Sequence, residues 1–227
     1  MSRNFQFAVD EFYHVYNRGT DKRIIFLDDN DRKRFYYLLF LCNGEKSFEI
    51  SELDLKQVFD FKRGETLVDI GAVCLMDNHF HLLLHEKKEN GISKFMHKIS
   101  TAYTNYFNRK YKRTGALFGG RFKAEHSNND RYLNYLFAYI HLNPIKVIQD
   151  DWQGGGINDL KKVQKYLEKY VFSSYLDYQD SQNRLYGLIL NKEAFPEYFS
   201  EPKDFDVFIN DWLELKAEKE EVEKLGE

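Results

Sequence analysis

Two apolar runs separated by two polar residues constrain the fold of this chain more than any other feature. The runs span residues 67–76 and 79–85, and Asp77-Asn78 lies between them. Each run has the length of a strand, and the polar pair between them favours a tight turn. We therefore predict a hairpin of two central strands in a sheet.

The segments on either side of this hairpin alternate between strand and helix patterns. The carboxylates of Asp28, Asp29 and Asp31 suit the N-terminal cap and first turn of a helix. The expected elements are strand 12–17, helix 28–42, strands 67–76 and 79–85, helix 92–111, strand 121–126 and a helix from about 129 to Pro144. This order predicts an α+β fold, a ferredoxin-like sandwich with a central antiparallel sheet and helices on its face.

Residues 1–152 are expected to form this domain, with an insertion at about 45–66 that contains a short helix from Ser51 to Phe59. Residues 153–227 are expected to form a partly helical C-terminal extension, which is acidic toward its end. The helical parts are placed at 160–170 and 205–223, and Gly154-Gly155-Gly156 is interpreted as a linker.

Composition limits the class of protein. The 227 residues are 43% hydrophobic and 17% aromatic, which is enough for a packed core. No apolar run approaches the roughly 18 residues of a membrane span, and the first residues do not resemble a signal peptide. Cys42 and Cys74 lie in apolar stretches, so we expect buried thiols of a reducing compartment. These features predict a cytoplasmic protein with no membrane partner.

Charge is distributed unevenly along the chain. The net charge is only −3. Residues 94–126, however, hold eight basic side chains and one acid, whereas residues 201–227 hold ten acids and four lysines. A basic segment of this kind suits the phosphates of a nucleic acid, although a solvated helix face is the alternative explanation.

His79 and His81 form the first candidate site. Strand side chains alternate, so the two imidazoles share one face about 7 Å apart, and Phe80 points to the other face. That spacing lets both rings converge on one cation, whereas His85 lies too far along the strand. Packing is the alternative role, but two buried imidazoles without partners are costly.

Tyr139 and Asn143 form the second candidate site. They are four residues apart on the expected last helix and therefore share a face. A core aromatic and a C-terminal cap are the alternative roles of these residues. His141 points elsewhere and is expected either to pack or to make a peripheral contact.

Several motifs together resemble the single-tyrosine HUH transposases, and most of all their REP-associated branch. They are YHVYNRG (13–19), IFLDD (25–29), MDNHFHLLL (76–84), YTNYFNRKY (103–111), GALFGGRFK (115–123) and YIHLNPIK (139–146). The resemblance covers roughly residues 10–150. The chain departs from the family pattern at Asp77, where proline is usual, and at residues 118–120, where an aromatic-Gln-Gly is usual.

The resemblance implies an enzyme, with Tyr139 as the nucleophile and with His79, His81 and Asn143 as ligands of Mg²⁺ or Mn²⁺. The implied reaction is metal-assisted cleavage and rejoining of single-stranded DNA through a 5′-phosphotyrosine, as in DNA transposition and recombination. The implied partner is single-stranded or hairpin DNA, such as a repeated extragenic palindrome, in a bacterial cell where the protein associates with the nucleoid.

The basic segment supplies candidate DNA contacts around this site. They are Arg18, Arg109, Lys110, Lys112, Arg113, Arg121, Lys123 and Lys146, with Phe118 as a surface on which an unpaired base could stack. The sequence leaves the oligomeric state open, and a homodimer is one of the assemblies considered.

Two other functional classes share part of this pattern. A histidine-triad nucleotide hydrolase needs a third histidine two positions after His81, where Leu83 stands. A domesticated, non-catalytic protein that recognises palindromic repeats would bind the same DNA without forming a covalent adduct. All four key residue types are present here, which weighs against a loss of catalysis.

Overall fold

A computed structural model of the chain describes residues 6–179 and 184–224. Its strands are β1 (Phe12–Arg18), β2 (Asp69–Met76), β3 (His79–His85) and β4 (Lys123–His126). Its helices are α1 (Asp29–Cys42), α2 (Gly91–Lys110), α3 (Asp130–Leu142), α4 (Trp152–Gly155), α5 (Leu160–Leu167), α6 (Tyr175–Tyr178) and α7 (Pro202–Lys224).

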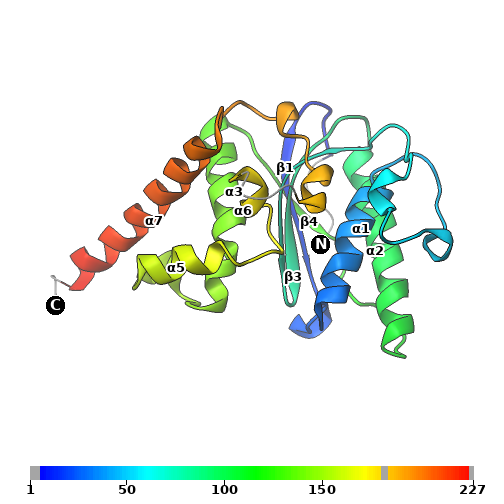
Figure 1. The fold of residues 1–227 in the computed structure, drawn as a ribbon, viewed down its shortest axis with the longest axis horizontal. Coiled ribbons are helices and arrows are strands. Elements are labelled where there is room, and N and C mark those ends of the chain that lie inside the picture. The colour runs from blue at the N-terminus through cyan, green and yellow to red at the C-terminus, as the bar shows by residue number, and fades with distance from the viewer. Residues whose placement is uncertain (1–5, 180–183, 225–227) are drawn as a thin grey trace.

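The four strands form one antiparallel sheet in the order β2-β3-β1-β4, with the predicted hairpin joining β2 to β3. Helices α1 and α2 cover one face, and α3 covers the other together with the C-terminal extension (Figure 1). The predicted α+β sandwich with a central antiparallel sheet is therefore confirmed.

Local chemistry explains where α1 and α3 begin. The Asp28 side chain accepts a hydrogen bond from the backbone N–H of Asp31 (2.9 Å), and the Asn129 side chain accepts one from Tyr132 (2.8 Å). Each cap satisfies an N–H group that a helix start otherwise leaves without a partner. Pro144 lies in the short 3-10 turn (Asn143–Val147) that follows α3, as expected near that helix end.

The turn after β1 brings two distant parts of the chain together. The backbone N–H of Gly19 donates to the carbonyl oxygen of Asn78 in the β2–β3 turn (2.9 Å). A Cβ atom at Gly19 would lie only 2.3 Å from the carbonyl oxygen of Arg23, so this position needs glycine. The close approach holds Arg18 opposite His79, its partner in the β1–β3 register.

The insertion differs from its prediction. The helix expected from Ser51 to Phe59 is absent, and two 3-10 turns, Ile50–Glu52 and Val58–Asp60, occupy this region. The segment is too polar and mixed to bury a helical stripe. Its apolar side chains instead pack singly against α1, as Phe59 does against Phe40 with ring centroids 5.2 Å apart.

The C-terminal extension packs into the same core as α3. The backbone N–H of Leu75 donates to the carbonyl oxygen of Phe172, and that of Ser174 donates to the carbonyl oxygen of Val73 (2.9 Å each), so residues 172–174 pair with the outer edge of β2. The expected glycine linker is a helical turn, α4, that begins with the buried Trp152. The division at residue 152 stays a prediction about the chain, and residues 180–183 and 225–227 of the extension lie outside the described residues.

The cysteines and the helices bear on two expectations from composition. Cys42 and Cys74 are free and buried, as predicted. Within residues 6–179 and 184–224, no helix combines the length and apolar character needed to cross a membrane.

A substitution in α7 tests whether the extension and the sheet unfold together. Phe205 is fully buried, with its ring 5.1 Å from that of His141 and 5.0 Å from that of Tyr178. We expect Phe205→Ala to lower the free energy of unfolding by about 3–5 kcal/mol, because it removes a large core side chain. Urea unfolding followed by circular dichroism should show one shifted transition.

The matched control is Val207→Ala on the same helix, which is 59% exposed and should change stability by no more than about 0.5 kcal/mol. A Phe205→Ala protein with two separate transitions would show instead that the extension unfolds alone.

Candidate active site

Strand β3 places two imidazoles on the sheet face that α3 covers. The rings of His79 and His81 have centroids 4.9 Å apart, while Phe80 points to the opposite face and packs 4.9 Å from the ring of Phe35. The predicted alternation of these side chains is confirmed. His85 is directed elsewhere, since its Nδ1 lies 3.0 Å from a carboxylate oxygen of Asp69.

Helix α3 brings Tyr139 to the same place. The ring of Tyr139 stands edge-on to that of His81, with centroids 5.5 Å apart, and to that of His14, at 5.6 Å. Asn143, one turn later, is fully buried at the end of α3. The structure thus brings together the four side chains that were singled out on separate parts of the sequence. His141 lies away from them, hydrogen-bonded to Phe137 and Ser174, and packs as expected.

Buried polar atoms in this group lack hydrogen-bond partners. They are Nε2 of His81 and both amide atoms of Asn143. Such atoms are costly unless a ligand satisfies them. Two imidazole nitrogens and an amide oxygen suit Mn²⁺, and Mg²⁺ also accepts such oxygen donors. The residues present therefore fit a divalent cation held by His79, His81 and Asn143. Among the described residues no three His, Cys, Asp or Glu side chains cluster as a metal site, so this site depends on the amide.

Both histidines are held neutral by their surroundings. Burial, followed by the positive charges of Arg18 and Lys146, lowers the pKa of His79 to about 4. Burial also places the pKa of His81 well below its usual value. A neutral imidazole is the form that binds a metal ion.

The phenol has a different electrostatic environment. Burial raises the pKa of Tyr139, and the nearby amide of Asn143 partly offsets this effect. The ammonium group of Lys146 lies 5.6 Å from the centre of the Tyr139 ring. Burial and the charge of Arg18 lower the pKa of Lys146. A cation beside the ring favours the phenolate over the phenol.

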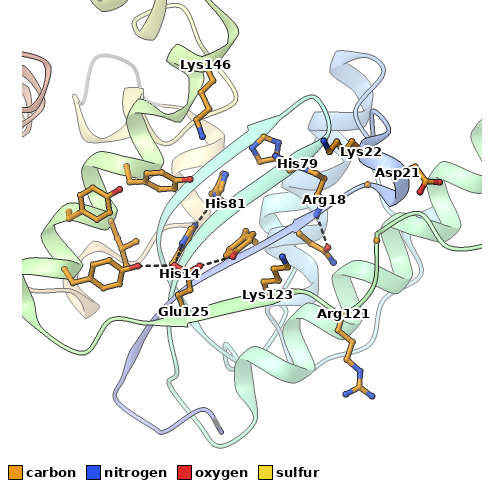
Figure 2. Close-up of a pocket in the computed structure, with 18 residues that line it drawn as sticks. His14, Arg18, Asp21, Lys22, His79, His81, Arg121, Lys123, Glu125 and Lys146 are labelled. Carbon is orange, nitrogen blue, oxygen red and sulfur yellow. Dashed lines mark hydrogen bonds and ion pairs between the residues drawn. The ribbon is translucent and has the colours of Figure 1, made fainter. Parts of the chain in front are cut away.

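A cavity of about 640 Å³ opens onto these groups. Figure 2 shows it with Lys146, Arg18, Lys22 and Lys123 around the two histidines. Its other wall is aromatic, and Tyr132, Tyr135 and Tyr139 follow one another along α3 with neighbouring ring centroids 5.9 and 5.8 Å apart. The site therefore combines a basic wall for phosphates with an aromatic wall for bases.

The family model described as "Transposase IS200 like" matches residues 13–143, more than half of the chain. The chain belongs to the IS200-like transposase family.

A solved structure of a REP-associated tyrosine transposase bound to a REP hairpin is also similar to this transposase. The two are 14% identical with a TM-score of 0.48, and the match covers 88% of this chain and 94% of the other. No curated protein matched the chain.

The predicted DNA contacts of the transposase fall into two groups. Arg18, Arg121, Lys123 and Lys146 line the cavity. Arg109, Lys110, Lys112 and Arg113, at the end of α2, do not line it. Lys110 is instead paired with the carboxylates of Asp28 (2.8 Å) and Asp31 (2.7 Å), and Arg113 is hydrogen-bonded to Asn108 and Ala116. Lys110 and Arg113 thus have local partners, and the DNA contacts of both groups stay predictions.

The prediction for Phe118 is corrected by its burial. Phe118 is only 6% exposed and packs edge-on against Phe80, with centroids 5.9 Å apart. Its ring belongs to the core between the sheet and α2 and offers no face to a base. Tyr135, which is 36% exposed on the cavity wall, is the better stacking surface.

Two residues beside the candidate ligands were missed from the sequence. His14 on β1 lies with Nε2 2.8 Å from Nδ1 of His81, and Glu125 on β4 has a carboxylate oxygen 3.8 Å from Nδ1 of His14. The neighbouring imidazole of His14 lowers the pKa of Glu125 to about 2. The only signal for His14 was its place in the motif YHVYNRG, because the contact depends on how the strands pair.

A stability measurement tests whether the amide of Asn143 lacks a partner. Asn143→Leu replaces a buried, unpartnered polar group by an apolar group of similar size, and it should raise the free energy of unfolding of the metal-free protein by about 1–3 kcal/mol. Urea unfolding in EDTA measures this change. Asn17→Leu is the comparison, because the Asn17 amide donates to the carbonyl oxygen of Gly120 and accepts from the N–H of Arg18, so its replacement should destabilise. A loss of stability in Asn143→Leu would mean that the amide has a partner after all.

Proposed function

We propose that this transposase cleaves and rejoins single-stranded DNA through a covalent 5′-phosphotyrosine formed on Tyr139. The observation that carries the proposal is the meeting of Tyr139 with His79 and His81 at a basic cavity, with the unpartnered amide of Asn143 buried one helical turn after Tyr139. Such a site has a nucleophile, ligands for a cation and room for a phosphate.

Different side chains would carry out different parts of this reaction. Arg18 and Lys146 would bind the non-bridging oxygens of the scissile phosphate. Tyr139 would form a bond to phosphorus while the bond to the 3′ oxygen of the preceding nucleotide breaks, which leaves a 3′-OH and a 5′-phosphotyrosine. Attack by a 3′-OH would reverse the step and rejoin DNA without ATP.

A divalent cation held by His79, His81 and Asn143 would offset the charge that builds up on the phosphate oxygens. Lys146 would stabilise the phenolate of Tyr139, whose pKa burial raises. The aromatic wall of α3 would stack unpaired bases next to the scissile bond.

The proposed substrate is hairpin or palindromic DNA, as the motifs shared with the REP-associated branch imply. Unpaired bases next to a hairpin stem could reach the aromatic wall, whereas the same bases inside a duplex could not. We therefore propose that the cleaved bond lies in the unpaired strand beside the hairpin stem.

The nucleophile is tested with a labelled hairpin oligonucleotide and Mn²⁺. The wild-type protein should form an adduct that survives denaturing electrophoresis, and Tyr139→Phe should form none, because only the phenol oxygen can become bonded to phosphorus. Tyr135→Phe, one helical turn away on the same wall, is the matched control and should keep the adduct. DNA binding without an adduct under any metal would favour the non-catalytic palindrome-binding protein instead.

The basic wall is tested by the salt dependence of DNA binding. Arg121→Ala should reduce the slope of log K against log salt by about 0.7, the value for one lost phosphate contact on a single strand. Fluorescence anisotropy with a single-stranded oligonucleotide measures the slope. Lys161→Ala on the exposed face of α5 is the control and should leave the slope unchanged. Equal slopes for Arg121→Ala and wild type would remove Arg121 from the DNA surface.

A further inference from the structure

A chain of three side chains crosses the sheet behind the candidate metal ligands. It runs from Glu125 on β4, through His14 on β1, to His81 on β3. These are neighbouring strands of the sheet, and His14 lies directly opposite Glu125 in the β1–β4 register. His81 lies diagonally from His14, opposite Tyr16, within the reach of long side chains. Figure 2 shows the three in a row, and all three line the cavity.

The carboxylate of Glu125 favours a proton on the end of His14 that faces it, which is Nδ1. A carboxylate can only accept hydrogen bonds, and this one already accepts from the hydroxyl groups of Tyr16 (2.9 Å) and Tyr132 (3.1 Å). The two hydroxyls fix the carboxylate facing Nδ1 of His14 at 3.8 Å. Of the two tautomers of His14, the one with its proton on Nδ1 directs that proton toward the carboxylate and presents a lone pair on Nε2.

The lone pair of His14 determines the tautomer of His81 in turn. Nε2 of His14 and Nδ1 of His81 are 2.8 Å apart, so exactly one proton must lie between them for a hydrogen bond. With His14 as the acceptor, this proton belongs to Nδ1 of His81. Nε2 of His81 is then left with a lone pair, and this is the buried atom without a partner.

We propose that His14 and Glu125 are positioning residues that hold His81 in the tautomer whose Nε2 is open to a divalent cation. His79 is held in the same way by a shorter route, since its Nδ1 lies 2.6 Å from the amide oxygen of Asn78, which can only accept. In both histidines, Nε2 is then the nitrogen left with a lone pair, and it would be the one to bind a cation. The identity of the ligand rests on the proposed function, whereas the tautomer of His81 does not.

Partners of this kind matter because they orient a ligand and raise its basicity. Loss of one such partner typically costs 10–100-fold in metal affinity. Without His14, the buried Nδ1 of His81 would lack an acceptor for its proton, and the proton would be better placed on Nε2, next to the cavity. The cation would then have to displace it.

The first test reads the tautomer in metal-free protein. Nitrogen-15 NMR of the imidazoles distinguishes a protonated Nδ1 from a protonated Nε2. We expect His81 to carry its proton on Nδ1 in the wild type and to shift it to Nε2 in His14→Phe, which keeps a ring beside His81 but has no acceptor. A wild-type His81 protonated on Nε2 would overturn the inference.

The second test measures Mn²⁺ affinity by calorimetry. His14→Phe should bind 10–100-fold more weakly than wild type. Glu125→Gln should also bind more weakly, because it removes the charge that orients His14. His14→Gln should recover part of the loss, since its amide oxygen can accept the proton of His81. Wild-type affinity in His14→Phe, or no difference between His14→Phe and His14→Gln, would contradict the proposal.

The chain offers a matched control in the same sheet. His126 on β4 has Nε2 2.8 Å from a carboxylate oxygen of Glu11 and does not line the cavity. His126→Phe removes a comparable histidine–carboxylate pair and should change neither the tautomer of His81 nor the Mn²⁺ affinity. A loss of affinity in His126→Phe would show that these measurements report general damage to the sheet, and it would remove their support for the proposal.

The outcome is separable from that of the proposed function. A normal phosphotyrosine adduct together with unchanged Mn²⁺ affinity in His14→Phe would reject the positioning role and leave the function standing. If the wild type forms no adduct but shows the predicted tautomer and the predicted losses of Mn²⁺ affinity, the proposed function is rejected and the positioning role stands.

Discussion

The packing of α3 against the sheet is the contact on which the rest of the site depends. Leu133, Leu136 and Ile140 of this helix are buried in one apolar cluster with Cys74 and Leu83 of the sheet. Burial of such side chains contributes roughly 1.5–3 kcal/mol each to the stability of the fold. The helix is therefore fixed in its rotation about its own axis and in its position on the sheet. Tyr139 and Asn143 lie on the border of this contact, and their distance from the two histidines follows from it.

The same geometry leaves polar groups buried without partners. Nε2 of His81 and the amide of Asn143 lie in a buried region where a protein without a ligand would have apolar side chains. Proteins tolerate such groups mainly where they serve a ligand, and the surrounding core supplies the stability that this arrangement costs. The coincidence of these unpartnered atoms with the proposed nucleophile is the strongest physical argument for the proposed site.

Much of this could be predicted from the sequence because it follows from short periodic patterns. The alternation that places His79 and His81 on one face, and the four-residue spacing of Tyr139 and Asn143, each depend on a single element. The order of strands and helices predicted an antiparallel sheet with helices on its face, although not which residues face each other across strands.

The features that were not predicted depend on contacts between elements. His14 reaches His81 only through the β1–β3 register, and the burial of Phe118 depends on the path of a loop over α2. The pairing of Lys110 with Asp28 joins the end of one helix to the start of another, which periodicity cannot reveal. The C-terminal helices had a visible apolar pattern, but nothing in the pattern showed that it would be buried against α3.

The pairing of residues 172–174 with β2 has a consequence for how the protein can be divided. All eight residues of β2 are buried, and this segment satisfies backbone groups along its outer edge. An uncovered apolar strand of this length is a ready template for another chain. A fragment cut at residue 152 would present that edge to solvent and tend to self-associate, so the shared family region is better studied with its own C-terminal residues attached.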